Sequence, residues 1–304
     1  MRITTALILG AVFIGGCASE PPPKSAAENA AGIVIDFSKD ELSSWSEMPM
    51  GTYHIPNSQV LVSGFQKGNG FAIALSSVGG VAMTSAAFGV ATDTSGGKVA
   101  VQSKVAALHI SLASPAARIL GTLLKRPEFE KFSLTANPAA FVLKIGGDVV
   151  LQFFDRGDVR PFVVLNADLL TPQGTSLWSA RYAASSGAPR PLSGENSWTT
   201  PLGTLNETIS AELQRALLVL LTDVSSPYPR DKNDRIAVQG YFPFIPKRIQ
   251  VVGLRLADGA DWFAFSANVP TTSLLSGVNI MDKSEAQYRA ATNKDPRIKA
   301  LATP

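Results

Sequence analysis

Hydrophobic and polar residues alternate with a period of two through the middle of the chain. The alternation begins at Phe132 and predicts strands over 132–136, 140–145, 148–155, 162–170 and 175–184. Within the last two strands, alternate apolar residues would share one face: Val163, Leu165, Ala167 and Leu169, then Trp178, Ala180 and Tyr182. The intervening TPQG has proline second and glycine fourth, as in a type I turn. These two strands are therefore predicted to form a hairpin.

Two other parts of the chain repeat their apolar residues every three or four positions, which is the α-helical period. The first covers 101–124, where Ser114 and Pro115 predict a restart, with serine as N-cap and proline at the first helical position. The second covers 201–224, and its wide apolar stripe is expected to lie on the sheet. That stripe consists of Leu205, Ile209, Leu213, Ala216, Leu217 and Leu220.

Further strands are predicted on both sides of this central part. Residues 32–37 and 59–65 precede it, and 236–242, 247–256 and 261–267 follow it. From about Asp282 the chain becomes polar and aperiodic, which predicts a loosely ordered tail over 282–304. The expected fold class is α+β, a mixed or antiparallel sheet with amphipathic helices packed on it, plus a C-terminal β-rich extension. The main domain would cover 31–230 and the extension 231–281.

The segment 71–91 contains no charged residue and is long enough to span a bilayer as a helix. Small side chains recur in it every four residues, which would place them on one helix face: Ala72, Ser76, Gly80 and Thr84. Such a stripe lets helices approach closely. Its serines and glycines dilute the hydrophobicity, so a buried, close-packed helix is the favoured interpretation. A partner or self-association face and a membrane span are the two alternatives.

The N-terminal residues have the pattern of an export signal. Arg2 precedes an apolar run, Ala6 to Ile14, that is too short to cross a bilayer. Ile14 and two glycines then lead into Cys17, the only cysteine in the chain. This ending closely resembles the lipobox of bacterial lipoproteins. The resemblance implies that residues 1–16 are removed, that a diacylglycerol is attached to the Cys17 sulfur, and that the new N-terminus is acylated. The alternative is an ordinary cleaved signal with a chance cysteine or a buried thiol.

The residues after Cys17 fit the same interpretation. The stretch 17–30 is small, polar and proline-rich and has no apolar period, so it is expected to be a flexible tether between a lipid anchor and a folded body. Two or three acyl chains anchor a protein stably, because each buried methylene contributes about 0.8 kcal/mol. In the lipoproteins of enteric-type bacteria an aspartate directly after the cysteine favours retention in the inner membrane. Ala18 therefore implies the outer membrane, with the body facing the periplasm.

The amino-acid composition argues against some classes of function. The chain has 304 residues, of which 45% are hydrophobic and 17% charged, and its net charge is only +3. A balance this mild, without basic runs interleaved with aromatics, argues against nucleic acid as a partner. The chain contains two histidines, which excludes a histidine-rich metal site. No cofactor or metal site is predicted.

Few residues invite a catalytic interpretation. His54 and His109 could each serve a serine, but nothing in the sequence pairs them with one. His54 is expected in a loop, and His109 in a helical context as a core or boundary residue. Asp148, Asp155 and Asp158 could attract a cation, but the lysines and arginines around them favour a solvated charged edge. No catalytic residue is predicted.

The order of predicted elements from Leu134 to Val224 suggests a family. Strands, the TPQGTSLW turn and strand, Trp198 and a helix ending LLTDV follow one another. This resembles periplasmic ABC-transport auxiliary lipoproteins and the wider group with the TolB N-terminal or CsgG-type fold. The resemblance implies a role in envelope transport or assembly, and it supplies no functional residues.

Two functional hypotheses follow. The first is a non-catalytic, lipid-anchored envelope protein that binds other proteins or lipid, as an accessory component of a transport, secretion or assembly complex. The second is a lipid-anchored periplasmic hydrolase of envelope substrates. A pocket that gathers His54 or His109 with a serine and a carboxylate would favour the hydrolase.

Overall fold

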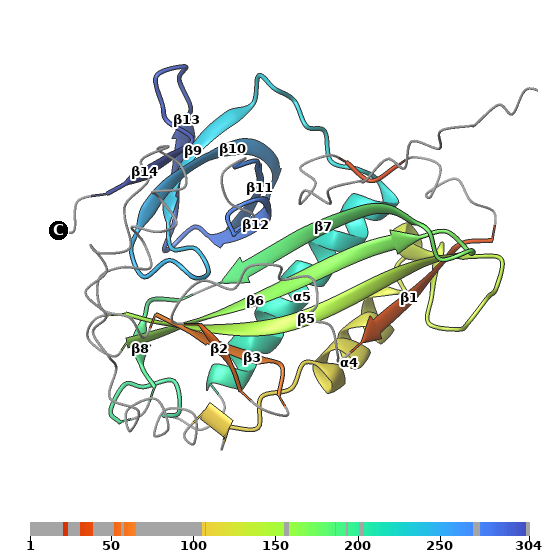
Figure 1. The fold of residues 1–304 in the computed structure, drawn as a ribbon, viewed down its shortest axis with the longest axis horizontal. Coiled ribbons are helices and arrows are strands. Elements are labelled where there is room, and N and C mark those ends of the chain that lie inside the picture. The colour runs from red at the N-terminus through yellow and green to blue at the C-terminus, as the bar shows by residue number, and fades with distance from the viewer. Residues whose placement is uncertain are drawn as a thin grey trace, which may run out of the picture.

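The structure is a computed structural model, and it describes residues 21–23, 31–38, 52–55, 58–64, 105–106, 108–154, 158–185, 187–192, 194–200, 204–269 and 274–301. These residues form an α+β fold, a large mixed sheet with two α-helices packed on it (Figure 1). The predicted fold class is therefore confirmed. The sheet has two regions that differ in how they are covered.

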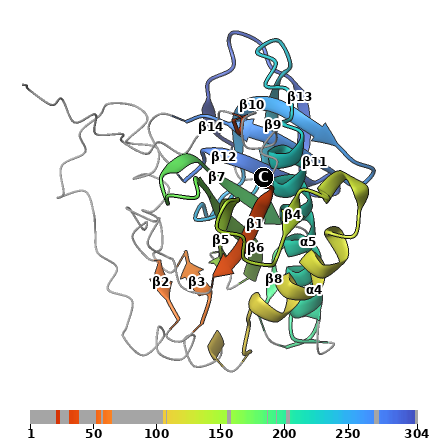
Figure 2. The ribbon, with the colours of Figure 1, turned by 90° about the vertical axis from the view of Figure 1, so that its right-hand side faces the viewer.

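The helix-covered region consists of the described elements from β1 to helix α5. Its elements are β1 (Ile33–Ser38), β2 (Tyr53–His54), β3 (Val60–Ser63), α4 (Ala113–Leu123), the 3₁₀ turn η3 (Pro127–Phe129), β4 (Phe132–Ser133), β5 (Phe141–Phe153), β6 (Asp158–Leu170), β7 (Ser176–Ser185), β8 (Arg190–Pro191) and α5 (Thr204–Ser225). Helix α5 packs on β6 and β7, and α4 packs beside it. Both helices lie on the same face of the sheet (Figure 2).

The C-terminal extension consists of strands. They are β9 (Arg235–Gly240), β10 (Ile249–Asp258), β11 (Trp262–Ala267), β12 (Gly277–Asp282), β13 (Gln287–Ala290) and β14 (Ile298–Ala300). The sheet is continuous between the two regions, in the order β13-β9-β10-β11-β12-β7-β6-β5-β1-β4. The connection is a parallel pairing of β12 with β7, from Val278 opposite Tyr182 to Met281 opposite Ser185.

The central hairpin is confirmed in detail. Strands β6 and β7 pair antiparallel, and the Gly174 N–H donates to the Thr171 carbonyl oxygen at 2.8 Å across the turn. Both predicted apolar faces lie in the main core beneath the helices. Helix α5 also buries its predicted stripe in this core. The opposite face of β5–β7 contains a smaller apolar cluster that includes Val150, Phe162 and Val164.

Several local predictions are corrected. Helix α4 begins at Ala113 with Leu112 as its N-cap, so Ser114 lies inside the first turn. The two strands predicted over 140–145 and 148–155 are replaced by one strand, β5 (Phe141–Phe153), in which Gly147 faces the side chains of Leu112 and Phe37. Glycine here permits close packing within a strand and does not end one.

The C-terminal residues are more ordered than their composition predicts. The stretch 282–304 was expected to be a loose tail, but β13 pairs with β9 and β14 pairs with β10. The Asp295 carboxylate accepts hydrogen bonds from both terminal nitrogens of Arg289 and from the Thr292 N–H and hydroxyl. Edge pairing and local polar contacts therefore order this stretch without an apolar period.

The expected tether is described only at 21–23, where Pro22 is buried. The other residues of 17–30 lie outside the described residues, so the flexible tether stays a prediction. Among the described helices, none has both the length and the apolar character that crossing a membrane requires.

Candidate functional site

The main sequence candidates fall outside the described residues. Cys17 and the small-residue stripe Ala72, Ser76, Gly80 and Thr84 all lie there, as does Asp155. The anchor, and the three interpretations of 71–91, therefore stay predictions.

The two histidines lie in different surroundings. His54 belongs to β2 and is partly buried, and its Nε2 contacts the Ser58 carbonyl oxygen at 2.6 Å. The Ser58 hydroxyl donates to the Ile55 carbonyl oxygen and accepts from the Val60 N–H, so it is held by backbone. His109 is exposed and has a φ of 47°, which corrects its expected place in a core or boundary. Within the described ranges, no hydrogen bond joins either imidazole to a serine hydroxyl or a carboxylate.

Asp148 and Asp158, the two described aspartates near the β5–β6 connection, lie in different surroundings. Asp148 is buried within β5, opposite Val164 of β6, which corrects its expected place on a solvated edge. Asp158 begins β6 and is partly exposed. Across the part of the chain that the structure describes, no group of three or more histidine, cysteine, aspartate or glutamate side chains could hold a metal ion.

The face of β5, β6 and β7 opposite α5 contains buried polar residues beside its small apolar cluster. We call it the polar face. Register places its residues in rows across the strands, and several of these residues are buried: Asp148, Gln152, Arg160, Arg181, Ser185 and Asn279. Buried polar groups require partners, because an unpaired one costs about 1–3 kcal/mol.

Arg160 is the most constrained charge on the polar face. Its terminal nitrogens donate to the Gly187 carbonyl oxygen and, at 3.2 Å, to the Ser185 hydroxyl. Its guanidinium also lies over the rings of Tyr241 and Phe162, 5.2 and 5.7 Å from their centroids. Burial lowers the pKa of Arg160, and the nearby Glu285 carboxylate opposes that shift. This cation is held by aromatic faces and backbone more than by a close carboxylate.

Gln152 is the cross-strand neighbour of Arg160. Its amide nitrogen donates to the Phe153 carbonyl oxygen at 2.9 Å. Its Oε1 and the Arg160 Nε are both buried without a hydrogen-bond partner among the described residues. The pair therefore leaves one acceptor and one donor unsatisfied at neighbouring positions of the polar face.

A second polar cluster lies at the end of α5, on the other face of the sheet. The Asp223 side chain is fully buried, and its carboxylate accepts the Tyr182 hydroxyl at 2.7 Å and two bonds from Arg230 at 2.6 Å each. The Tyr228 N–H donates to the same carboxylate at 3.0 Å. Burial first, and then the Asp223 charge, raise the pKa of Tyr182 well above its ordinary value. The cluster joins β7, α5 and the segment 226–234, which leads into the extension and which we call the leading segment.

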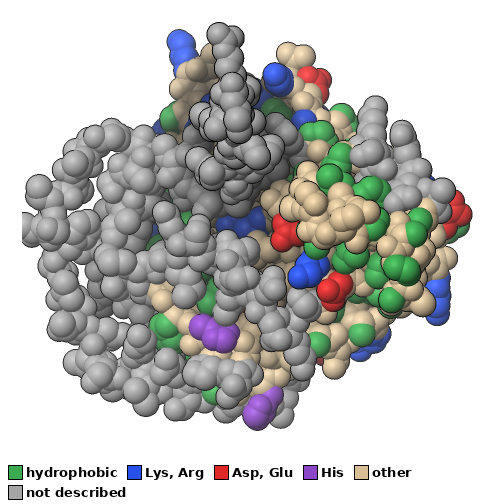
Figure 3. All heavy atoms as spheres, turned by 45° about the vertical axis from the view of Figure 1, so that its right-hand side comes forward, with side chains coloured by type: hydrophobic (Ala, Val, Ile, Leu, Met, Phe, Trp, Pro, Cys, Tyr) green, Lys and Arg blue, Asp and Glu red, His purple; other side chains and the backbone are tan. Residues whose placement is uncertain are grey.

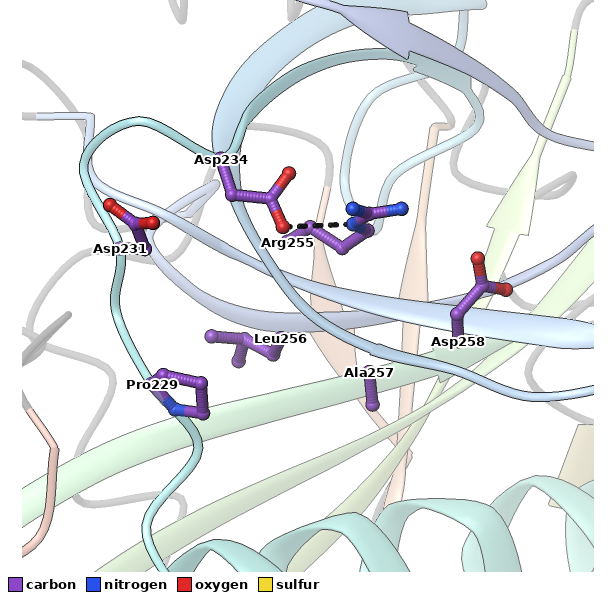
Figure 4. Close-up of a pocket in the computed structure, with 7 residues that line it drawn as sticks. All are labelled: Pro229, Asp231, Asp234, Arg255, Leu256, Ala257 and Asp258. Atoms are coloured by element: carbon purple, nitrogen blue, oxygen red, sulfur yellow. Dashed lines mark hydrogen bonds and ion pairs between the residues drawn. The ribbon is translucent and has the colours of Figure 1, made fainter.

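A pocket of about 220 Å³ lies between that leading segment and β10 (Figure 4). Its lining residues are Pro229, Asp231, Asp234, Arg255, Leu256, Ala257 and Asp258. The Arg255 Nε donates to Asp234 at 3.0 Å. The Asp258 carboxylate accepts from Lys283 and the Tyr288 hydroxyl, and these hydrogen bonds lower the pKa of Asp258. Arg255 and Lys283 therefore offset the charges of two of the three aspartates that line the pocket, Asp234 and Asp258.

Sequence reasoning missed Arg160 and Asp223. Both stand inside apolar runs, Arg160 in VRPFVVL and Asp223 in LLVLLTDV. A single charge in such a run is a usable signal of a buried, partnered group, because charged residues are rarely buried alone.

Comparison with known proteins adds no relative. No protein-family model matches the chain, and no curated protein matches it.

Proposed function

We propose that this protein is a non-catalytic, lipid-anchored component of the bacterial cell envelope, which acts by binding other envelope proteins. The observation that carries the proposal is Cys17, the single cysteine, placed directly after Ile14-Gly15-Gly16 at the end of a signal-like apolar run. A lipid on this sulfur would hold the body at a membrane surface.

The order of elements supports an accessory role in transport, secretion or assembly. Strands β5, β6 and β7 followed by the long helix α5 agree with the order that resembles the auxiliary lipoproteins of ABC transport. The location that Ala18 implies is the periplasmic face of the outer membrane. The partners would be envelope proteins, and self-association is one form that this binding could take.

The anchor is tested by labelling cells with a fatty acid. Wild type should incorporate the label, and Cys17→Ser should lose it and accumulate as an unprocessed precursor. Ser19→Ala is the matched control, because it removes a nearby side chain and leaves the sulfur, so its labelling should equal wild type. Equal labelling of wild type and Cys17→Ser would contradict the proposal.

The proposed location in the outer membrane is tested by fractionating the cell membranes. Wild type should sediment with outer membrane, and Ala18→Asp should shift it to the inner membrane in a host whose sorting machinery reads this position. Inner-membrane wild type would contradict the proposed location.

The binding role is tested by crosslinking the anchored protein in intact membranes and identifying what is captured. A defined envelope protein, captured by wild type and lost when Cys17→Ser removes the anchor, would support the accessory role. Capture that does not differ between the two would contradict a role that depends on the anchor.

A further inference from the structure

The chain enters the sheet at one identifiable end, which we call the tether end. There β1, β4, β5 and β7 begin and β6 finishes (Figure 1). Backbone hydrogen bonds hold the incoming chain: the Ile33 N–H donates to Lys131 at 2.9 Å, and the Phe141 N–H donates to Gly32 at 3.2 Å. The Asn137 side chain also donates to the Ala31 carbonyl oxygen at 3.1 Å. The position of the incoming chain at this end is therefore fixed.

The tether end carries two exposed leucines. Leu134 is 53% exposed and Leu177 is 43% exposed, and among the described residues these are the exposed large hydrophobic side chains. Leu134 directly follows β4, and Leu177 lies at the start of β7. Single exposed leucines are common on protein surfaces. Here both flank the point where the chain enters.

Partly exposed apolar residues lie on the strands between the two leucines, and Leu134 follows Ser133, the β4 residue opposite Val34. Val34 of β1 lies opposite Val142 of β5, and Val142 lies opposite Leu170 of β6. Leu170 lies opposite Ser176, and Leu177 follows Ser176 at the point where the pairing register of β6 and β7 shifts. The row crosses the strands from β1 to β7, a width of roughly 14 Å at the usual strand spacing. In Figure 3, which turns this end of the molecule forward, hydrophobic side chains gather among scattered charged ones.

The apolar row is only one residue deep along the direction of the strands. The next row on the same face is charged, with Asp36 opposite Lys144 and Lys144 opposite Asp168. Rows on one face repeat every second residue, so this charged row lies about 7 Å deeper along the strands. A depth of about 7 Å fits an interfacial contact, in which apolar groups reach about 5–10 Å into the boundary between headgroups and acyl chains.

The short reach of the chain brings this end close to a bilayer. The chain is described again from Pro21, and from Cys17 to Pro21 it can span at most about 14 Å when fully extended. The stretch 21–23 and the start of β1 both lie in the right half of Figure 1. A lipid on Cys17 would therefore hold this side of the body near the membrane surface.

We infer that the tether end of the sheet is a membrane-contacting surface, on which Leu134, Leu177 and the row between them dip into the lipid interface. The inference rests on the proposed lipid anchor. It adds an orientation: the strands point at the bilayer, and the C-terminal extension is held away from it, free to meet partners.

The test uses the full-length lipidated protein in vesicles of phosphatidylethanolamine and phosphatidylglycerol whose acyl chains carry a nitroxide quencher. Leu134→Cys and Leu177→Cys each provide one labelling site for a fluorophore, because lipidation blocks the sulfur of Cys17. Lys294→Cys, on an exposed turn between β13 and β14, is the matched control. Quenching at 134 and 177 should exceed that at 294 by about twofold or more if these side chains reach the acyl boundary.

Three results would overturn the inference. Equal quenching at all three positions would mean that the body has no preferred orientation, and no quenching at 134 and 177 would mean that lipid does not touch them. A blue shift at 134 and 177 without quenching would mean that protein covers the leucines. Fatty-acid labelling of the same samples separates this failure from failure of the anchor, since a labelled but unquenched protein keeps the anchor and loses the surface.

Discussion

The helix-covered region and the C-terminal extension both bury β-strands, but different groups cover the strands in each. In the first, α5 lies along β6 and β7 and fills the core with aliphatic side chains. In the extension, the described residues form no helix, and antiparallel strands close on an aromatic cluster. Phe265 lies 6.2 Å from Phe242 and 6.3 Å from Phe263, and Phe263 lies 4.5 Å from Tyr288, between ring centroids. In the extension, large aromatic rings provide the buried apolar area that helix α5 provides in the helix-covered region.

The two regions meet through the pairing of β12 with β7, through shared apolar packing and through polar contacts. Arg215 of α5 forms ion pairs with Asp261 and Asp282 of the extension, while Asp223 binds Arg230 of the leading segment. Apolar packing tolerates many arrangements, whereas paired buried charges allow few. The polar contacts therefore restrict how the extension continues the sheet, in addition to the β12–β7 pairing, and they offer ways to separate the two regions experimentally.

The largest effect is expected from Asp223→Ala. The change leaves Arg230 and the Tyr182 hydroxyl without their shared acceptor, and breaking a buried pair in this way costs about 3–5 kcal/mol. Urea unfolding should show this loss in the free energy of unfolding. Asp231→Ala, which removes an exposed carboxylate next to Arg230 in the sequence, is the control and should stay within about 0.5 kcal/mol of wild type. A loss at 223 no larger than that at 231 would mean that the junction does not depend on the pair.

A matched pair of core truncations tests whether the regions unfold together. Phe265→Ala should lower the free energy of unfolding by about 3–5 kcal/mol and Leu217→Ala by about 2–5 kcal/mol, since both side chains are fully buried. Because the sheet is continuous through β7 and β12, each change should shift one common transition, seen alike by tryptophan fluorescence and far-UV circular dichroism. Two separate transitions, each moved by only one variant, would contradict a shared unit.

Tyr182→Phe isolates the hydroxyl at the junction. It should lower the free energy of unfolding at neutral pH by about 1–3 kcal/mol, because Asp223 loses one donor. The raised pKa of Tyr182 also gives a pH dependence. Its contribution is fully present below the ordinary tyrosine pKa of about 10 and is lost as pH rises beyond it toward the raised value. The variant should therefore lose less stability than wild type on alkaline titration, and identical alkaline slopes would count against the buried hydroxyl.

The smallest effect is expected at the pocket. Asp234→Asn removes the ion pair with Arg255, whose side chains are 37% and 40% exposed. Exposed pairs of this kind contribute about 0.2–1 kcal/mol, so thermal unfolding should shift only slightly. A loss comparable to that of Asp223→Ala would show that the pocket wall supports the extension.

Local patterns predicted the parts of the fold that are stabilised locally. The β6–β7 hairpin and α5 follow from period and turn residues, because each buries a regular face. The polar clusters could not be predicted, since Tyr182, Asp223 and Arg230 come from three elements that only the tertiary fold brings together. Strands β13 and β14 were missed because they are short and mostly exposed, and β9 and β10 supply their pairing.

The lipid anchor is tested most directly by the mass of the N-terminal peptide of the protein extracted from membranes. We expect the mature chain to begin at Cys17 and to carry the added mass of a diacylglycerol on sulfur and an acyl chain on the amino group. A chain that still begins at Met1, or a mature peptide with an unmodified Cys17, would contradict the anchor.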